Sequence, residues 1–154
     1  MSNFVVYIAI LTAAAIPFFE ATFAVPLGIL GGTNLLLTLL AGVIGNFLTI
    51  VVVVILSEKV RNWFIRDKES KRNRRAAGIW KKFGFYGFIL LGPILLSSHV
   101  TAIAAVSFGA PKMKTIVYVT ASIIIWTVIL AVLAYIGMDL LGLEDVQLLK
   151  KYLN

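Results

Sequence analysis

The longest uncharged run in the chain restricts its fold more than any other feature. Ala21 to Leu56 spans 36 residues without Asp, Glu, Lys, Arg or His. A straight helix of that length would measure about 54 Å, whereas the hydrocarbon core of a bilayer is about 30 Å thick. The run must therefore break, and the break is predicted at residues 31–34, where the sequence reads GGTN. Residues 35–56 then form one full transmembrane helix.

Apolar residues dominate the remaining chain as well. A hydrophobic content of 60% and a mean hydropathy of +0.99 over 154 residues exceed what a water-soluble core can bury. We therefore expect one all-α integral membrane domain over residues 1–154, in the multi-pass form typical of a prokaryotic plasma membrane. The first four residues lack the positive charge of a signal peptide, so the N-terminus is expected to be retained.

A basic segment divides the chain into two halves. Residues 57–82 contain ten Lys or Arg and three acidic residues, which predicts a cytoplasmic location. Val60, Trp63 and Phe64 recur at helical spacing and predict a basic amphipathic helix on the membrane surface. Contact with anionic lipid headgroups is the expected role of this basic loop, in preference to binding of nucleic acid.

The two halves follow a similar plan. In each half, an interior proline precedes a glycine that introduces an uninterrupted span. These residues are Pro17 and Gly31 in one half and Pro93 and Gly109 in the other. When the halves are aligned on their glycines, Glu20 falls opposite Ser98. The pattern predicts two inverted repeats, which in small transporters bracket a polar site near the membrane midplane.

Two topologies fit the apolar runs. In the first, residues 4–30 and 83–110 each cross the membrane, giving four spans with both termini in the cytoplasm. In the second, residues 4–34 and 83–110 are re-entrant hairpins, the spans are residues 35–56 and 115–138, and both termini lie outside. Interior prolines favour the hairpins, because proline removes a helical donor and clashes with the preceding turn. The predicted hairpin breakers are Pro17, Pro26, Gly28, Pro93 and Gly109. A polar tail over residues 139–154 follows the last span.

Glu20 is the leading candidate for a functional side chain. A carboxylate in hydrocarbon costs at least a few kcal/mol and is normally paired, protonated or beside water. The alternative is an acid that caps a turn or a helix N-terminus. His99 is the other titratable group at depth, and its alternative role is packing through hydrogen bonds. The predicted substrate or proton site comprises Glu20, Thr22, Ser97, Ser98 and His99.

Other residues predict packing or exclude chemistry. Gly42, Gly45 and Asn46 form a small and polar stripe suited to close contact between helices. The chain contains no cysteine and one histidine, which excludes disulfides, thiolate chemistry and a His-rich metal site. Ser98 and His99 are adjacent and would point about 100° apart on a helix, unlike a hydrolytic triad. We expect no enzyme activity, cofactor or metal.

Several motifs between residues 16 and 142 point to one protein family. They are EATFAVPLG from Glu20, GVIGN from Gly42, KKFGFYG from Lys81 and the hairpin from Pro93 to Gly109. Together they resemble the small multi-drug export protein family, a distant relative of the DedA-like membrane proteins. The resemblance implies two inverted hairpin-plus-span repeats and proton-linked movement of a lipid or amphipathic molecule, with Glu20 as the hairpin acid. Thr22 stands where family members tend to keep an arginine, which puts binding of an anionic headgroup by a buried arginine in doubt.

These features predict a small membrane transporter or flippase-like protein that moves a lipid or amphipathic molecule with proton coupling. The alternative is a non-transporting membrane subunit that binds or regulates a larger membrane complex. A length of 154 residues hardly encloses a pathway, so a transporter of this kind is expected to form a homodimer. Membrane lipids are the other expected partners.

Overall fold

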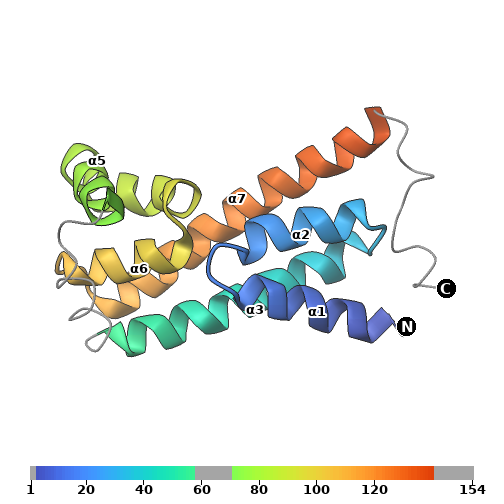
Figure 1. Cartoon of the computed structure of the whole chain (residues 1–154), viewed down its shortest axis with the longest axis horizontal. Coiled ribbons are helices and arrows are strands. Elements are labelled where there is room, and N and C mark those ends of the chain that lie inside the picture. Colours follow the sequence, from blue (N-terminus) through green and yellow to red (C-terminus); the bar gives the residue numbers. More distant parts are fainter. Residues whose placement is uncertain (1–2, 58–70, 141–154) are drawn as a thin grey trace. The chain divides into compact units, whose positions relative to one another are not determined.

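The computed structural model describes residues 3–57 and 71–140, and all secondary-structure elements in these residues are helices. The helices are α1 (Asn3–Ala15), α2 (Glu20–Leu30), α3 (Leu35–Ile55), α5 (Lys71–Leu95), α6 (Ser98–Ser107) and α7 (Lys112–Leu140) (Figure 1). The prediction of an all-α chain is confirmed for these residues. The predicted amphipathic face of Val60, Trp63 and Phe64 and the polar tail from residue 141 lie outside the described residues.

In the described parts of the chain, two helices are long and apolar enough to cross a membrane. They are α3, with 21 residues, and the 26-residue stretch Lys112–Gly137 of α7, against the ~20 residues that a bilayer requires. Both expose large apolar side chains along their length, including Leu36 and Ile55 on α3 and Val117 and Leu133 on α7. Exposed aliphatic side chains of this kind suit contact with acyl chains.

The helices pack into two units that have the same composition. Unit 1 consists of Met1–Phe47 and Ile124–Asn154, and unit 2 of Leu48–Ile123. Unit 1 therefore contains α1, α2, the first part of α3 and the second part of α7. Unit 2 contains the rest of α3, α5, α6 and the start of α7. Each unit thus holds a pair of short helical segments, the beginning of the long helix that follows them and the end of the other long helix.

In unit 1, α1 and α2 form an antiparallel hairpin that packs against α3 (Figure 1). The two helices have 13 and 11 residues and are joined by a turn over residues 16–19, which contains Pro17. Small residues on α3 allow α1 and α2 to pack close to its backbone. A Cβ on Gly42 would collide with Val25 of α2, and one on Gly45 would collide with the carbonyl of Leu11 of α1. Asn46, the third residue of the predicted packing stripe, is fully buried.

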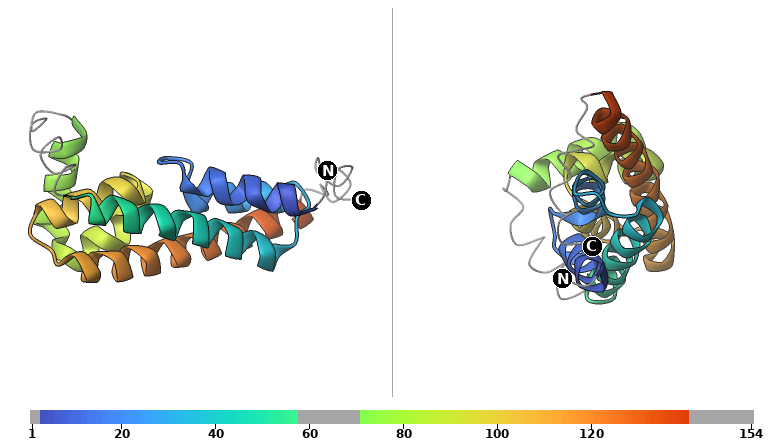
Figure 2. Two further views of the ribbon diagram at one scale, coloured as in Figure 1. Left: turned by 90° about the horizontal axis from the view of Figure 1, so that it is seen from below. Right: turned by 90° about the vertical axis from the view of Figure 1, so that its right-hand side faces the viewer.

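In unit 2, the second part of α5 forms a hairpin with α6. Gly84 divides α5, because its φ of 64° and ψ of −167° are not helical and change the direction of the chain (Figure 2). A positive φ of this kind is readily adopted only by glycine. After this bend the helix runs to Leu95, and α6 begins at Ser98. A Cβ on Gly92 would lie 2.5 Å from the side chain of Thr101, so the two backbones are closely packed.

Three of the five predicted hairpin breakers do not break a helix, and this corrects the sequence-based prediction. Pro26 and Gly28 lie inside α2, and Pro93 lies inside α5. A proline removes only one helical hydrogen bond, so packing on both sides can hold the helix together. Gly28 instead allows close packing of α2 against Thr38 of α3, since a Cβ there would lie 2.8 Å from the Thr38 methyl group. Pro17 lies in a turn, and Gly109 follows α6.

The ends of α2 and α6 share one hydrogen-bond pattern. In each, a glycine with positive φ donates to the carbonyl three residues back, and the next residue donates to the carbonyl five residues back, as in a Schellman cap. The N···O pairs are Gly32 to Ile29 (2.9 Å), Thr33 to Gly28 (3.1 Å), Gly109 to Val106 (3.0 Å) and Ala110 to Ala105 (3.0 Å). The helices that follow also begin alike, because the hydroxyls of Thr38 and Thr115 each donate to the carbonyl four residues earlier. Corresponding residues are 77 positions apart throughout, so Glu20 corresponds to Ser97, and the sequence alignment of Glu20 with Ser98 was wrong by one residue.

Candidate functional site

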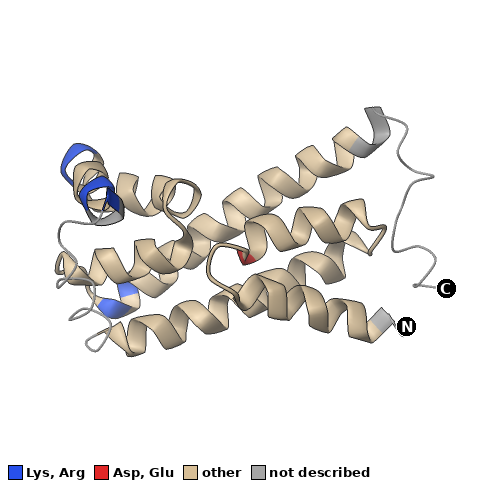
Figure 3. Ribbon diagram, in the orientation of Figure 1, with Lys and Arg blue, Asp and Glu red and all other residues tan. Residues whose placement is uncertain are grey.

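The carboxylate of Glu20 is buried at the turn of the first hairpin. Glu20 is the first residue of α2, its side chain is 2% exposed, and its backbone N–H donates to the carbonyl of Ile16 at 3.2 Å. Among the side chains that the structure describes, it is the single acidic one (Figure 3). The turn that begins α2 therefore places a carboxylate inside an apolar unit.

The position of Glu20 offsets part of the cost of burying a charge. The first N–H groups of a helix lack intrahelical partners, and the helix dipole favours a negative charge beside them. Phe19 precedes the helix and makes no side-chain capping bond to these groups. The start of α2 thus provides local electrostatic support for the carboxylate.

The backbone is strained at both hairpin turns. Phe18, Glu20 and Ser97 have φ values of 75°, 41° and 113°, and they are the three non-glycine residues with positive φ in the described parts of the chain. Such conformations cost of order 1–3 kcal/mol each and persist only where the surrounding structure enforces them. Because strain of this kind gathers at functional sites, both turns are candidates for a functional role.

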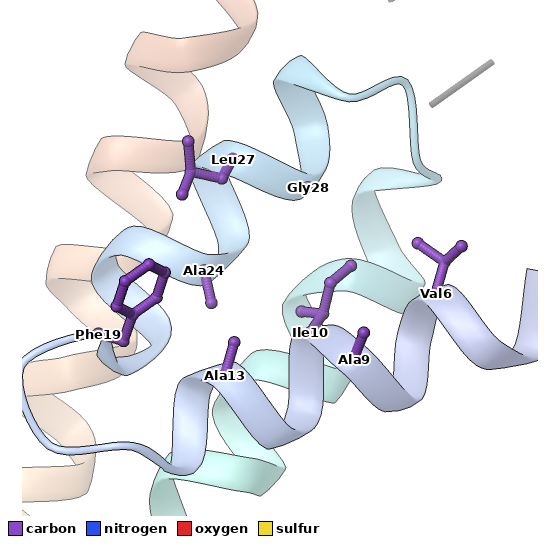
Figure 4. A pocket seen from close by; sticks show the side chains of 8 residues that line it. All are labelled: Val6, Ala9, Ile10, Ala13, Phe19, Ala24, Leu27 and Gly28. Atoms are coloured by element: carbon purple, nitrogen blue, oxygen red, sulfur yellow. The ribbon is translucent and has the colours of Figure 1, made fainter. Parts of the chain in front are cut away.

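An open apolar groove runs along the first hairpin. Its volume is about 290 Å³, close to the lower end of the range for ligand pockets. The lining residues are Val6, Ala9, Ile10 and Ala13 of α1, Phe19 before α2, and Ala24, Leu27 and Gly28 of α2 (Figure 4). All eight are apolar or glycine. Since Phe19 directly precedes Glu20, the groove ends beside the turn that carries the buried acid.

The second hairpin carries a buried cluster of hydroxyls around His99. Its side chain is 3% exposed, and Nε2 lies 2.9 Å from Oγ1 of Thr49 on α3. Nδ1 lies 3.3 Å from Oγ of Ser98, which is fully buried. A hydroxyl can donate or accept, so these partners satisfy both ring nitrogens in either tautomer. The hydrogen bonds therefore connect the imidazole to α6 and to α3.

Ser97 has a local structural role at the start of α6. Its Oγ accepts from the backbone N–H of Val100 at 3.4 Å, as an N-cap, and its carbonyl accepts from the hydroxyl of Thr101 at 2.7 Å. Ser97 thus fixes the helix that presents Ser98 and His99. The remaining predicted site residue, Thr22, is buried on α2, two residues after Glu20.

The structure groups the predicted site residues by hairpin. Glu20 and Thr22 belong to unit 1, whereas Ser97, Ser98 and His99 belong to unit 2. Thr49 was missed at the sequence level, because it lies 50 residues from His99 in an apolar run. A hydroxyl in the middle of a membrane span was the available signal.

No group of three or more His, Cys, Asp or Glu in the described residues could hold a metal ion.

A comparison with protein families identifies the chain. The family described as "putative small multi-drug export protein" matches residues 20–129, well over half of the sequence. The chain belongs to this family. The match begins at Glu20 and covers α2, α3, α5, α6 and most of α7. The resemblance inferred from the sequence motifs is confirmed for the small multi-drug export family, while the relation to DedA-like proteins stays a prediction.

The family and the fold agree on the broad class of protein. The family name indicates a small membrane export protein, and the two apolar spans fit a membrane protein. Neither a curated protein nor a solved structure matches the chain.

Proposed function

We propose that this member of the small multi-drug export family is a flippase-like transporter that moves a lipid or amphipathic molecule across the cell membrane with proton coupling at Glu20. One observation carries the proposal: a carboxylate that is 2% exposed lies at the turn of a helical hairpin, and the residue before it, Phe19, lines an apolar groove. Such a transporter needs an apolar surface for its substrate and a titratable group for the proton, and the first hairpin contains both.

The groove and the acid have different tasks in this mechanism. Val6, Ala13, Ala24 and the other lining residues accept the apolar part of the substrate. Glu20 takes up a proton when its surroundings are driest, because the neutral acid is far cheaper to bury than the carboxylate. It releases the proton when the hairpin turn is opened to water. Loading and release of the substrate are thereby linked to the proton.

The short helices support the proposed re-entrant hairpins. Helices α1, α2 and α6 have 13, 11 and 10 residues, whereas a transmembrane helix needs about 20. In the proposed arrangement, each hairpin enters and leaves the membrane on one side. Non-helical backbone at depth is tolerated only where protein or water surrounds it, which suits the buried turns at Glu20 and Ser97.

The shared caps support inverted repeats of a DedA-like kind. The glycine caps and the threonine bonds recur with a spacing of 77 residues, and each unit has the same composition of helical segments. A repeat of one hairpin and one span must be followed by a copy with the opposite orientation, because a single span changes the side of the membrane. Ser98 and His99 begin the second helix of the second hairpin, as Glu20 does in the first, and we assign them the corresponding role in their own unit.

A homodimer supplies the enclosure that one short chain lacks. Two hairpins and two spans are too few to surround a pathway, whereas a second copy of the chain would double the number of helices around it. The alternative role, a non-transporting subunit of a larger complex, would use the small residues of α3 to contact a partner. Gly42 and Gly45 instead contact α2 and α1 of the same chain, which favours the transporter.

The test uses the full chain in proteoliposomes. A fluorescent NBD-labelled phosphatidylglycerol, whose outer-leaflet copies are bleached by dithionite, reports lipid movement, and ethidium serves as an amphipathic cation. We expect an imposed pH gradient to accelerate movement of at least one probe. Glu20→Gln should reduce the rate at least tenfold and abolish its pH dependence. Glu20→Asp, which keeps a titratable carboxyl group, should retain the pH dependence.

Two results would contradict the proposal. Failure of the wild-type protein to move either probe would exclude a flippase-like function for these classes of substrate. Unchanged pH dependence in Glu20→Gln would remove the proton role from this residue. Gel filtration of each variant separates loss of function from loss of folding, and Glu20→Asp remains informative if Glu20→Gln misfolds.

A further inference from the structure

A second groove, in unit 2, combines basic and apolar side chains. Its volume is about 410 Å³, and its lining residues are Arg75, Gly78, Ile79, Lys82 and Phe83 of α5 before the bend, with Leu95 and Leu96 beyond it. The first five recur at positions i, i+3, i+4, i+7 and i+8, which places them on one face of the helix. Leu95 ends α5 and Leu96 lies in the hairpin turn, so the groove joins this helix face to the turn.

The groove is open between its two cations. Arg75 and Lys82 are seven residues apart, a rise of about 10 Å along a helix. Between them, a Cβ on Gly78 would meet no atom within 4 Å. The Lys82 ammonium group lies 5.2 Å from the centroid of the Phe83 ring, so a cation and an aromatic surface are adjacent in the groove. There is room for an anionic group between the two basic side chains.

The described side chains around this groove carry charge of one sign. The charged side chains that the structure describes in unit 2 are Lys71, Arg74, Arg75, Lys81, Lys82, Lys112 and Lys114 (Figure 3). All are basic, and the described side chains of this unit include no carboxylate. A bound anion would therefore be attracted by the whole set, and held by the two residues that line the groove.

We propose that this groove binds an anionic phospholipid. The phosphate lies between Arg75 and Lys82, where the guanidinium can bind two of its oxygens, and an acyl chain lies over Ile79, Phe83 and Leu95. A free inorganic anion would leave the apolar wall unused, and a neutral lipid would leave the cations unused. The site is distinct from the apolar groove of the first hairpin and does not depend on transport.

Lipid in this groove would also affect the second hairpin. Leu96, which lines it, directly precedes Ser97, the N-cap of the helix that carries His99. An acyl chain packed on Leu95 and Leu96 would hold this turn in place. The lipid is thus expected to act as a structural ligand of the hairpin as well as a surface anchor.

The experiment measures binding of short-chain lipids to the full chain in neutral detergent micelles. Dihexanoyl phosphatidylglycerol, dihexanoyl phosphatidylcholine and inorganic phosphate are titrated separately by microscale thermophoresis. We expect saturable binding of phosphatidylglycerol, and weaker binding of the other two by at least tenfold. Each basic residue near an anionic lipid contributes about fivefold in affinity, so Arg75→Gln with Lys82→Gln should weaken binding roughly 25-fold.

A matched double variant provides the control. Arg74→Gln with Lys81→Gln removes the same charge from adjacent positions of α5 that do not line the groove, and should weaken binding by less than about fivefold. Gly78→Leu fills the open floor without altering charge and should also reduce affinity. Equal losses in the two double variants would mean diffuse attraction and would overturn the proposal. Equal affinity for phosphate or for phosphatidylcholine, or normal binding in Gly78→Leu, would overturn it as well.

Discussion

Phe18 adopts a left-handed backbone conformation that glycine would adopt without strain. Its φ is 75°, whereas the adjacent Phe19 has an ordinary helical φ of −81°. Both side chains are at least half exposed, at 63% and 50%. Left-handed geometry costs a non-glycine residue about 1–2 kcal/mol. The strain at this turn is therefore accessible to a matched pair of substitutions.

Phe18→Gly is expected to raise the free energy of unfolding by about 1 kcal/mol relative to Phe19→Gly. The same amino acid is introduced in both, so the effect on the unfolded chain is shared and the difference reports the native backbone. Denaturation in mixed micelles, monitored by circular dichroism, measures this difference in the free energy of unfolding. Equal stability of the two variants would show that the turn is not strained at Phe18.

Gly45 is required by a close contact, and this gives a second residue-scale prediction. A Cβ at this position would collide with the Leu11 carbonyl, a backbone atom that cannot move aside independently. Gly45→Ala is therefore expected to destabilise the protein by about 1–3 kcal/mol. Gly137, on α7, serves as the control, because a Cβ added there would meet no atom within 4 Å. Thermal denaturation in detergent should show a loss for Gly45→Ala and none for Gly137→Ala.

At the scale of elements, His99 joins α6 to α3 through Thr49. The Nε2···Oγ1 distance of 2.9 Å predicts a measurable coupling between these side chains. In a double-mutant cycle of His99→Leu and Thr49→Val, we expect an interaction free energy of about 0.6–1.7 kcal/mol, as for other hydrogen bonds between membrane helices. Equilibrium unfolding in micelles supplies the four stabilities.

Thr12 offers a matched control for this cycle. Its hydroxyl bonds the carbonyl of Ile8 in its own helix at 2.8 Å, and its side chain is exposed. A cycle of His99→Leu with Thr12→Val should therefore give no coupling beyond the measurement error. Coupling with Thr12, or none with Thr49, would argue against a specific bond between α6 and α3.

The hairpins also show why proline patterns alone do not locate turns. The second hairpin turns at Ser97, whose φ of 113° is unusual for serine, and Pro93 lies earlier, within α5. The turn is held by the N-cap bond to Val100 and by the Thr101 bond to the Ser97 carbonyl. Both bonds require residues 98–101 to be helical, as they are at the start of α6. Sequence spacing therefore predicted a hairpin near Pro93, and local contacts decided its position.

For the whole molecule, membrane topology is the property that distinguishes hairpins from full spans. The absence of cysteine permits single-cysteine labelling without background. Phe4 and Met113 are 72% and 71% exposed and lie at the beginning of the apolar helices α1 and α7. Re-entrant hairpins predict that Phe4→Cys is labelled from outside and Met113→Cys from the cytoplasm. Four full spans predict the reverse for both.

Two further positions calibrate that measurement. Asn34, between α2 and α3, is expected outside in both topologies, and Lys71, at the start of α5, is expected in the cytoplasm. Impermeant maleimide applied to intact cells and to inverted vesicles should therefore label Asn34→Cys and Lys71→Cys from opposite sides. Cytoplasmic labelling of Phe4→Cys with external labelling of Met113→Cys would rule out the hairpins.

The amino-acid sequence by itself determined the class of this protein. An uncharged run of 36 residues cannot be a single straight helix in a bilayer, so the break before α3, the all-helical membrane class and the span after the break followed from the sequence. The motifs around Glu20 and Gly42 also sufficed to predict the family. These properties depend on composition and local spacing, which the sequence contains directly.

Only the tertiary structure decided which residues meet. The pairing of His99 with Thr49, the strained turn at Phe18 and the groove between Arg75 and Leu96 each depend on helices brought together in space. Pro26 and Pro93 were misleading as predicted breakers, because each lies inside a helix that continues past the missing hydrogen bond. Contacts between distant residues arise from the sum of many packing interactions, and local sequence spacing does not encode that sum.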